Sequence, residues 1–342
     1  MLIGELAAFG FGARAAGEDA AVPLRDLADK RGLLIGAAVG GRLLARDPDY
    51  AAVVAREFNI VTAENDFKWG PLSKERGKYD FTVADAVVTF AASHGIAVHG
   101  HTLVWHSQLP KWIEEGTFTR DEMLAILREH ITTVAGHFRE RVTMWDVVNE
   151  AFDGAALRES LWKKGIGPDY VEQAFRIARE ADPKARLIYN DYGAENMNAK
   201  SDAIYAFLKD ALKRGVPIHG IGFQAHVMPG QIDIASFKRN LRRFGDLGLE
   251  LYVTELDVRL KDPWTDAELR RQADTYRDIL DACLAEPAFK AFQTWGFTDK
   301  RSWIPNIHKG MGGALIFDTD YNPKPAYRAL HDRLSRPSDP GR

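Results

Sequence analysis

Val142-Thr-Met-Trp-Asp-Val-Val-Asn-Glu150 and Leu251-Tyr-Val-Thr-Glu255-Leu-Asp257 are the two stretches that decide the fold. Each is a short run rich in β-branched and aromatic residues, which favour strands, and each ends in a carboxylate. Because an unpaired charge in an apolar wall is costly, acids are expected where a strand runs out. Glu150 and Glu255 therefore predict two carboxylates on one rim of a sheet, the arrangement that cleavage of a glycosidic bond requires.

The alternation of short β-like runs with longer helical patterns continues along the chain. The predicted strands are Leu33–Val39, Ile60–Ala63, Ala97–Val104, Val142–Asn149, Leu187–Asn190, Ile218–Ala225, Leu251–Glu255 and Ala291–Gly296. The predicted helices are Asp47–Phe58, Val83–His94, Arg120–Phe138, Asp169–Ala181, Ala199–Arg214, Ile234–Leu247 and Asp266–Glu286. Such alternation indicates a parallel sheet with helical crossovers. Eight strands in one uninterrupted series predict an α/β fold with a single (β/α)8 TIM barrel over residues 24–333.

The composition excludes several classes of protein. The chain has 342 residues, of which 46% are hydrophobic and 27% charged, which is ordinary for a globular domain. A net charge of −3 without a basic stripe argues against nucleic acid as a partner, and no apolar run is long enough to cross a membrane. Cys283 is the only cysteine, so an intramolecular disulfide and a cysteine-based zinc site are both excluded.

The two ends of the chain are expected to lie outside the catalytic domain. Leu2–Phe11 is apolar apart from Glu5, and Ala13-Arg14-Ala15 has the small-residue spacing of a cleavage site, but a basic region is missing. We interpret residues 1–23 as a leader or the remnant of an export signal. Residues 334–342 are rich in Pro, Ser and Arg and are predicted to form a flexible tail.

Polar residues crowd the predicted strand ends, where a barrel of this type carries its chemistry. They are Glu64, Asn65, Lys68, His101, Trp105, Gln108, Asn149, Glu150, Asn190, Asp191, Tyr192, Gln224, His226, Glu255, Asp257, Trp295 and Trp303. Polar groups at seven of eight strand ends indicate one functional site rather than scattered surface residues.

These motifs resemble glycoside hydrolase family 10, the retaining β-1,4-xylanases, over about residues 24–333. The matching motifs are Thr62-Ala-Glu-Asn65 with Lys68-Trp69, Gly100-His-Thr-Leu-Val-Trp-His-Ser-Gln-Leu-Pro110, Trp145-Asp-Val-Val-Asn-Glu150, Asn190-Asp-Tyr192, Gln224-Ala-His226, Val253-Thr-Glu-Leu-Asp257, Thr294-Trp-Gly296 with Ser302-Trp303, and Asn322-Pro-Lys-Pro-Ala-Tyr327. The chain departs from the family pattern at Phe67, Ala225 and Gly193, none of which is expected to do chemistry.

The resemblance implies that Glu150 is the general acid/base and Glu255 the nucleophile. An acid that protonates a leaving oxygen must keep its proton near neutral pH, whereas a nucleophile must stay ionised. A hydrogen-bond chain from Glu255 through His226 to Asp257 would orient the nucleophile. We predict a carboxyl separation of about 5–5.5 Å, which corresponds to retention of anomeric configuration.

The resemblance also assigns the remaining polar residues to substrate. Asn149 would bind the sugar 2-hydroxyl, Gln224 would contact the nucleophile region, and Gln108 with Trp303 would crowd the hydroxymethyl group of a hexose. The implied substrate-binding residues are Glu64, Asn65, Lys68, His101, Trp105, Gln108, Asn149, Tyr192, Gln224, Trp295 and Trp303. The implied activity is that of an endo-1,4-β-xylanase, which hydrolyses internal bonds of xylan and xylooligosaccharides by double displacement.

Several alternatives stay open at this point. They are a barrel that binds xylan without cleaving it, a retaining endo-glucanase or cellobiosidase, and an aldolase that uses Lys68 as a Schiff-base lysine. We expect no metal and no cofactor, and a monomer. We expect the protein to be secreted or periplasmic, the alternative being a cytoplasmic enzyme that acts on imported xylooligosaccharides.

Overall fold

The computed structural model describes residues 22–337. Almost all of the predicted leader and the last five residues of the predicted tail lie outside this range. Within it, none of the helices is long and apolar enough to cross a membrane.

Eight parallel strands close into a barrel in the described part of the chain. They are β1 (Leu34–Val39), β2 (Ile60–Ala63), β3 (Ala97–Val104), β4 (Met144–Asn149), β7 (Arg186–Asp191), β8 (Gly220–Phe223), β10 (Glu250–Val258) and β12 (Phe289–Thr294). Each strand pairs with the next along the chain, and β12 pairs with both β10 and β1, which closes the ring. The predicted TIM barrel is therefore confirmed, with every strand end within three residues of the prediction.

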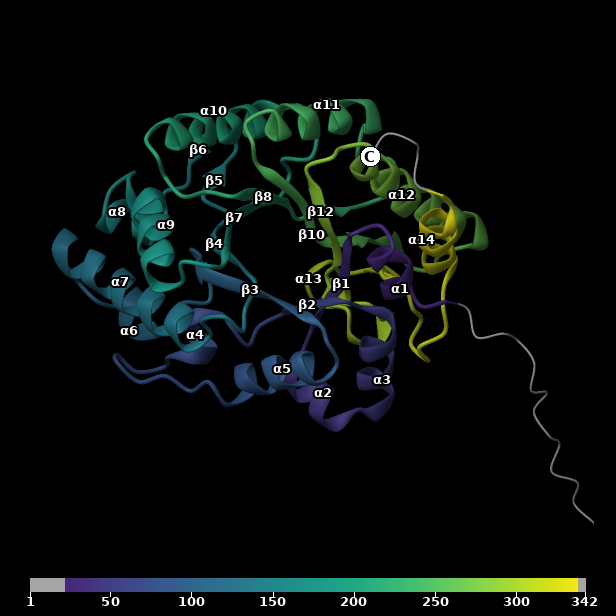
Figure 1. Ribbon diagram of the computed structural model, residues 1–342, viewed down its shortest axis with the longest axis horizontal. Coiled ribbons are helices and arrows are strands. Elements are labelled where there is room, and N and C mark those ends of the chain that lie inside the picture. The colour runs from purple at the N-terminus through teal and green to yellow at the C-terminus, as the bar shows by residue number, and fades with distance from the viewer. Residues whose placement is uncertain (1–21, 338–342) are drawn as a thin grey trace, which may run out of the picture.

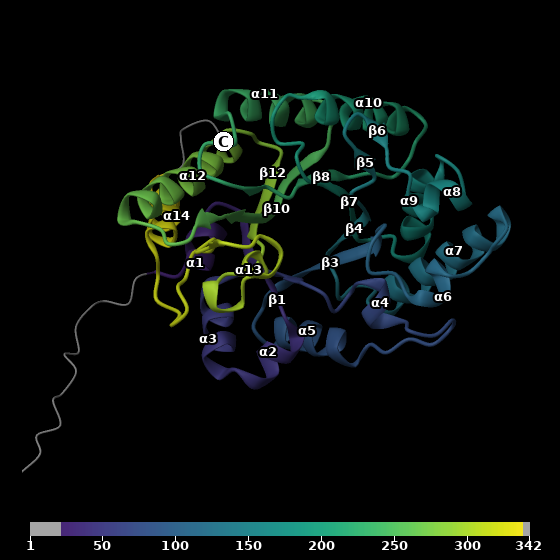
Figure 2. The same cartoon turned by 180° about the vertical axis from the view of Figure 1, so that it is seen from behind.

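Helices surround the strands on the outside of the barrel (Figures 1 and 2). The longer ones are α3 (Pro48–Glu57), α5 (Thr82–Ser93), α7 (Arg120–His137), α9 (Tyr170–Ala181), α10 (Ala199–Lys213), α11 (Ile234–Gly245), α12 (Asp266–Leu284) and α14 (Pro325–Ser335). Shorter elements are α1 (Leu24–Asp29), α2 (Gly41–Arg46), α4 (Trp69–Leu72), α6 (Lys111–Glu114), α8 (Leu161–Gly165), η1 (Asp299–Arg301), α13 (Ile304–Ile307), β5 (Phe152–Asp153), β6 (Ala156–Leu157), β9 (His226–Val227), β11 (Leu260–Lys261) and β13 (Met311–Gly312).

Local sequence fixes where the long helices begin. Thr119 and Glu122 form a reciprocal capping box at the start of α7, and Thr265 and Glu268 form another at the start of α12. Each box satisfies backbone N–H groups that have no partner inside the helix. These caps agree with the predicted helix starts.

The hydrophobic side chains form two main buried regions. The larger one lies between the strands and the surrounding helices, and Cys283 on α12 belongs to it. A smaller cluster comes from alternate positions of five barrel strands and fills the interior of the barrel. Its buried members are Ile60, Met144, Ile188, Tyr252 and Ala291. Successive residues of a strand face opposite sides of the sheet, so each strand contributes side chains to both buried regions.

The barrel interior also carries a polar layer. The Thr62 hydroxyl donates to Gln293 at 2.8 Å, and the Gln293 amide lies 2.9 Å from Nδ1 of His99. Nε2 of His99 lies 2.9 Å from Asp146, which also bonds His101 at 2.8 Å. His99 is fully buried and serves this network. Burial tends to raise the pKa of Asp146, but His99 and then His101 outweigh it and hold the pKa at about 2.

Helix α14 joins the two ends of the described chain. The buried carboxylate of Glu57 accepts hydrogen bonds from the Leu24 backbone at 3.0 Å and from the Tyr327 hydroxyl at 2.9 Å. This helix is not among the helices predicted from sequence. Pro325 occupies the first helical turn, where a missing N–H costs nothing. The buried Leu334 belongs to α14, so the helix extends past the predicted start of the tail.

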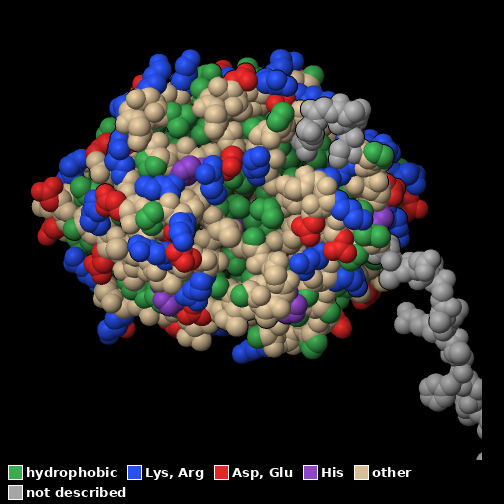
Figure 3. Space-filling view, viewed as in Figure 1, with side chains coloured by type: hydrophobic (Ala, Val, Ile, Leu, Met, Phe, Trp, Pro, Cys, Tyr) green, Lys and Arg blue, Asp and Glu red, His purple; other side chains and the backbone are tan. Residues whose placement is uncertain are grey.

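The face shown in Figure 3 carries Lys, Arg, Asp and Glu side chains interspersed over its surface. Opposite charges lie beside one another there, in agreement with the small net charge of −3. This face therefore offers no extended area of a single sign, of the kind that attracts nucleic acid.

Candidate active site

One cleft of about 970 Å³ crosses the mouth of the barrel. It extends from residues that follow β2 to residues of the β8–β9 segment, which lie across the barrel from β2 in the order of the strands. The predicted site residues that line it are Glu64, Asn65, Lys68, His101, Trp105, Gln108, Asn149, Glu150, Tyr192, Gln224, His226, Glu255, Trp295 and Trp303. Asp257 is the exception, since it is fully buried and lies behind His226.

Glu150 directly follows β4 and is held from three sides. Its backbone has a φ of 57° and its N–H donates to the Asn190 carbonyl at 2.9 Å, which turns the chain away from the strand direction. A left-handed glutamate is uncommon and strained. The carboxylate accepts hydrogen bonds from Trp105 Nε1 at 2.9 Å, Gln224 Nε2 at 3.0 Å and Asn149 Nδ2 at 3.3 Å.

Glu255 lies within β10 rather than at its end, which corrects the expectation from sequence. β10 pairs with β8 only as far as Val253, and then continues to pair with the short strand β9 through Asp257 and Val258. The strand therefore runs past the rim of the barrel. Glu255 lies just before Leu256, the last residue of β10 that pairs with β12, and lines the cleft. Glu255 is 4% exposed although it lines the cleft.

The expected hydrogen-bond chain behind Glu255 is present. Nε2 of His226 lies 3.1 Å from Oε2 of Glu255, and Nδ1 lies 2.8 Å from Oδ2 of Asp257. Burial alone would lower the pKa of His226. The charge and hydrogen bond of Asp257, followed by those of Glu255, outweigh burial and raise the pKa to about 10. His226 is therefore a cation at neutral pH and donates a hydrogen bond to each of the two carboxylates.

Asn190 connects the two glutamates, a role that the sequence analysis did not assign. The Thr254 hydroxyl donates to its side-chain oxygen at 2.7 Å, which turns its amide group toward the cleft. That amide donates to Glu255 at 2.7 Å and to Asn149 at 3.0 Å. A Cβ at position 222 would collide with the oxygen of Asn190, so Gly222 leaves the space for this residue.

Gln224 differs from its expected position. Its amide donates to Glu150 and to Asn149, at 3.0 and 3.1 Å, whereas the expectation was a contact with the nucleophile region. Here β8 ends at Phe223, and the chain bends after Gln224, where Ala225 has a φ of 61°. The sequence did carry a signal for the inward position of Asn190 and Asp146. Alternation along their strands places both side chains on the inner face of the barrel.

The residues after β2 form a charged floor at one end of the cleft. Nζ of Lys68 donates to Asn65 at 2.9 Å and lies 5.0 Å from the ring centre of Trp105 and 5.8 Å from that of Trp295. Burial lowers the pKa of Lys68, and the neighbouring carboxylates, Glu255 first, oppose this. Burial raises the pKa of Glu64, with Lys68 opposing it. Such a mixture of donors and acceptors between aromatic rings suits sugar hydroxyls.

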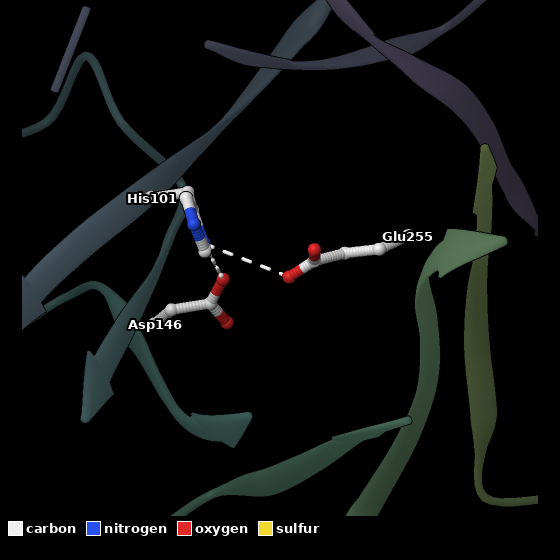
Figure 4. Close-up of side chains that lie close together, drawn as sticks. All are labelled: His101, Asp146 and Glu255. Carbon is white, nitrogen blue, oxygen red and sulfur yellow. Dashed lines mark hydrogen bonds and ion pairs between the residues drawn. The ribbon is translucent and has the colours of Figure 1, made fainter. Parts of the chain in front are cut away.

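His101, Asp146 and Glu255 point toward one another from β3, β4 and β10 (Figure 4). Their candidate ligand atoms all lie within 4.8 Å of one another. The same atom of His101, Nδ1, is bonded to Asp146 at 2.8 Å and lies 3.9 Å from Glu255. Because that nitrogen already serves Asp146, the group is explained as a hydrogen-bonded support for the buried carboxylates. The expectation that no metal takes part stays a prediction.

Tyr192 lies beside Glu150 at the other end of the cleft. Arg158 bonds the Glu150 carbonyl through Nε at 3.1 Å and the Tyr192 hydroxyl through Nη2 at 3.0 Å. Nζ of Lys200 lies 3.6 Å from the ring centre of Tyr192 and 2.7 Å from Asp191. Lys200 contacts the ring while 38% of the Tyr192 side chain stays exposed. This arrangement presents an aromatic surface next to one of the two carboxylates.

A TIM barrel with two hydrogen-bonded carboxylates in a cleft of aromatic and polar side chains defines a glycoside hydrolase. The chain belongs to glycosyl hydrolase family 10, whose family model matches residues 23–333.

Known proteins of this family are similar to the chain over most of its length. Endo-1,4-beta-xylanase B of Thermotoga neapolitana is 49% identical over 318 residues, which cover 92% of both chains. The crystal structure of native xylanase 10B from Thermotoga maritima is 50% identical, with a TM-score of 0.90, and the match covers 92% of this chain and 98% of that one. Xylanase 10B from Thermotoga petrophila RKU-1 in complex with xylobiose is 49% identical, with a TM-score of 0.91 and coverage of 93% and 98%.

Proposed function

We propose that Glu150 is the general acid/base and Glu255 the nucleophile of an endo-1,4-β-xylanase. The enzyme hydrolyses internal β-1,4-xylosidic bonds of xylan and xylooligosaccharides by double displacement, with retention of anomeric configuration. The observation that carries the assignment is the asymmetric support of the two glutamates. The Glu255 carboxylate is bonded to a histidine that is itself a cation. Within the described chain, the Glu150 carboxylate accepts hydrogen bonds from neutral indole and amide groups, and Nδ1 of His106 lies farther away, at 3.9 Å.

In the first step, Glu150 gives its proton to the glycosidic oxygen while Glu255 attacks the anomeric carbon. The leaving chain departs as an alcohol and a covalent glycosyl–enzyme ester forms. His226 and Asn190 donate hydrogen bonds to Glu255, so both hold its carboxylate in position. In the second step, Glu150 takes a proton from water, which attacks the same carbon and releases Glu255.

The sugar whose bond breaks would lie among Lys68, Trp105, Trp295 and Trp303, which line the cleft beside Glu255. Asn149 is fixed by donors from Asn190 and Gln224, and its own amide reaches Glu150. In this position it is suited to bind the 2-hydroxyl, where hydrogen bonds strengthen in the transition state.

Product analysis on xylohexaose and cellohexaose, followed by NMR of the new anomer, tests this function. We expect xylobiose and xylotriose from xylohexaose, with the β-anomer appearing first. Cleavage of cellohexaose with inert xylohexaose would overturn the substrate assignment. An initial α-anomer would overturn the assignment of Glu255 as a nucleophile.

Export and a monomeric state belong to the same proposal. The apolar run Leu2–Phe11, followed by the small-residue spacing at 13–15, supports secretion or a periplasmic location, and a cytoplasmic enzyme acting on imported xylooligosaccharides is the alternative. Activity in culture medium, periplasm and cytosol, with the N-terminal sequence of the mature protein, decides the location. Light scattering of the purified enzyme decides the oligomeric state.

A further inference from the structure

Arg259 is a cation in the cleft with no acidic partner among residues 22–337. It lines the cleft just after β10, is half-buried, and its backbone N–H donates to Val227 at 2.9 Å. Nη1 donates to the carbonyl of His226 at 3.2 Å, and none of the ion pairs within the described chain includes this guanidinium. The acids Glu255 and Asp257 of the same strand are already bonded to His226.

His308 lies close enough to Arg259 to sense its charge. The imidazole is half-buried, lines the same end of the cleft and contacts Trp303 edge-on, with ring centres 5.6 Å apart. Burial, followed by the positive charge of Arg259, lowers the pKa of His308. A cation and a hydrogen-bonding imidazole therefore face the same small region of the cleft.

The position of this region decides what it can bind. The family resemblance assigns Glu64, Asn65 and Lys68, which follow β2, to the sugars that stay on the enzyme. Arg259 bonds to the β9 residues His226 and Val227, across the barrel from β2. Arg259 consequently lies on the leaving-group side of the cleft.

The charge of Arg259 limits the ligands that this region of the cleft can bind. Partial burial of a guanidinium costs hydration free energy unless an anion pairs with it. Its planar N–H donors match the two oxygens of a carboxylate. The xylose backbone is neutral, whereas the acidic groups that a xylan chain can carry are uronic acid branches.

We propose that Arg259, with His308 beside it, forms a carboxylate-binding site on the leaving-group side of the cleft that recognises a uronic acid branch of xylan. The inference rests on the proposed function, because it places the branch by reference to the bond that is cleaved.

A substrate pair that differs only in charge tests this site. Glucuronoxylan is compared with the same polymer after its carboxyl groups have been reduced to alcohols, at low salt, and kcat/KM is measured for both. We expect the wild-type enzyme to favour the acidic polymer about tenfold, as for one charge-assisted hydrogen-bonded pair. Arg259→Gln should bring the ratio to about one, and Arg259→Lys should retain part of the preference.

Because the two polymers are compared within each variant, any general loss of activity caused by removing the Arg259 contact with His226 cancels in the ratio of kcat/KM values. Arg239→Gln removes the same charge from an exposed position on α11 and should keep the wild-type ratio. A wild-type ratio of one, or a ratio unchanged in Arg259→Gln, would overturn the proposal. Failure to cleave linear xylohexaose would instead overturn the proposed function, so the two are distinguishable.

Discussion

The indole nitrogen of Trp303 donates a hydrogen bond of 2.8 Å to Oδ2 of Asp257. The same oxygen is hydrogen-bonded to Nδ1 of His226, and the other ring nitrogen of His226 contacts Glu255. A ring in the wall of the sugar cleft is thereby connected to the group that orients the proposed nucleophile. Trp303 thus has two separable properties, its bulk and its N–H.

Replacing Trp303 separates these properties. Trp303→Ala removes the bulk that would crowd a hexose hydroxymethyl group, so the preference for aryl xylobiosides over aryl cellobiosides should fall about tenfold, the scale of a steric contact in a pocket. Trp303→Phe keeps most of the bulk and loses the N–H, so it should lower kcat while the preference stays. An unchanged preference in Trp303→Ala would remove the steric role.

Replacing each glutamate by alanine should give opposite results with azide. Glu255→Ala opens space on the nucleophile's face of the sugar, so azide should rescue cleavage of an activated aryl xyloside and give the α-azide. Glu150→Ala should still form the glycosyl–enzyme from a good leaving group, and azide should then give the β-azide. Natural xylan needs protonation, so its cleavage by Glu150→Ala should fall by about 10²–10⁴-fold. Exchange of the two azide products would reverse the assigned roles.

Asn190 is predicted to position the nucleophile through its amide. Asn190→Ala removes the donors to Glu255 and Asn149, so kcat should fall by about 10–100-fold, the scale of a hydrogen bond to a charged group, with a smaller effect on KM. Asn196→Ala, in the lining of the same cleft, is the control, since its amide group donates to the Gln231 carbonyl, accepts from the Asp233 N–H and makes no hydrogen bond to either glutamate within the described chain. Equal losses in both variants would contradict the positioning role.

His226 should make stability depend on alkaline pH. Burial opposes protonation, but Asp257 and Glu255 raise its folded pKa to about 10 from an ordinary value of 6.5. His226 therefore binds its proton more tightly in the folded state, and its stabilising contribution is complete below pH 6.5 and lost as the pH rises through 10. Urea unfolding at pH 6, 8 and 10 should show this loss in the wild type and a smaller one in His226→Gln. Parallel curves for the two proteins would refute the linkage.

The Tyr327 hydroxyl should stabilise the fold where the chain ends meet. Tyr327→Phe deprives the buried Glu57 of one donor, so the free energy of unfolding should fall by about 1–3 kcal/mol. Tyr321→Phe is the matched control, because Tyr321 donates in the same way to Asp47, a carboxylate near solvent. We expect a smaller loss there. Denaturant unfolding measures both, and equal losses would show that burial of Glu57 is not the cause.

Sequence alone determined the barrel and most of the site, because both follow from local pattern. Strand and helix periodicity predicted all eight barrel strands, and parallel strands bring their polar ends to one mouth whatever the details. That is why fourteen of the fifteen predicted site residues line one cleft. The fifteenth, Asp257, was correctly paired with His226 from the alternation of strand residues.

Only the tertiary structure decided how those residues are supported. The extension of β10 past the rim depends on its pairing with β9, and the contact of Gln224 with Glu150 depends on the bend at Ala225. The role of Asn190 needs Thr254 and the space above Gly222, which come from two other strands. Hydrogen bonds between strands distant in sequence depend on register and on close packing, to within a few tenths of an ångström. A local pattern of residue types carries no such information.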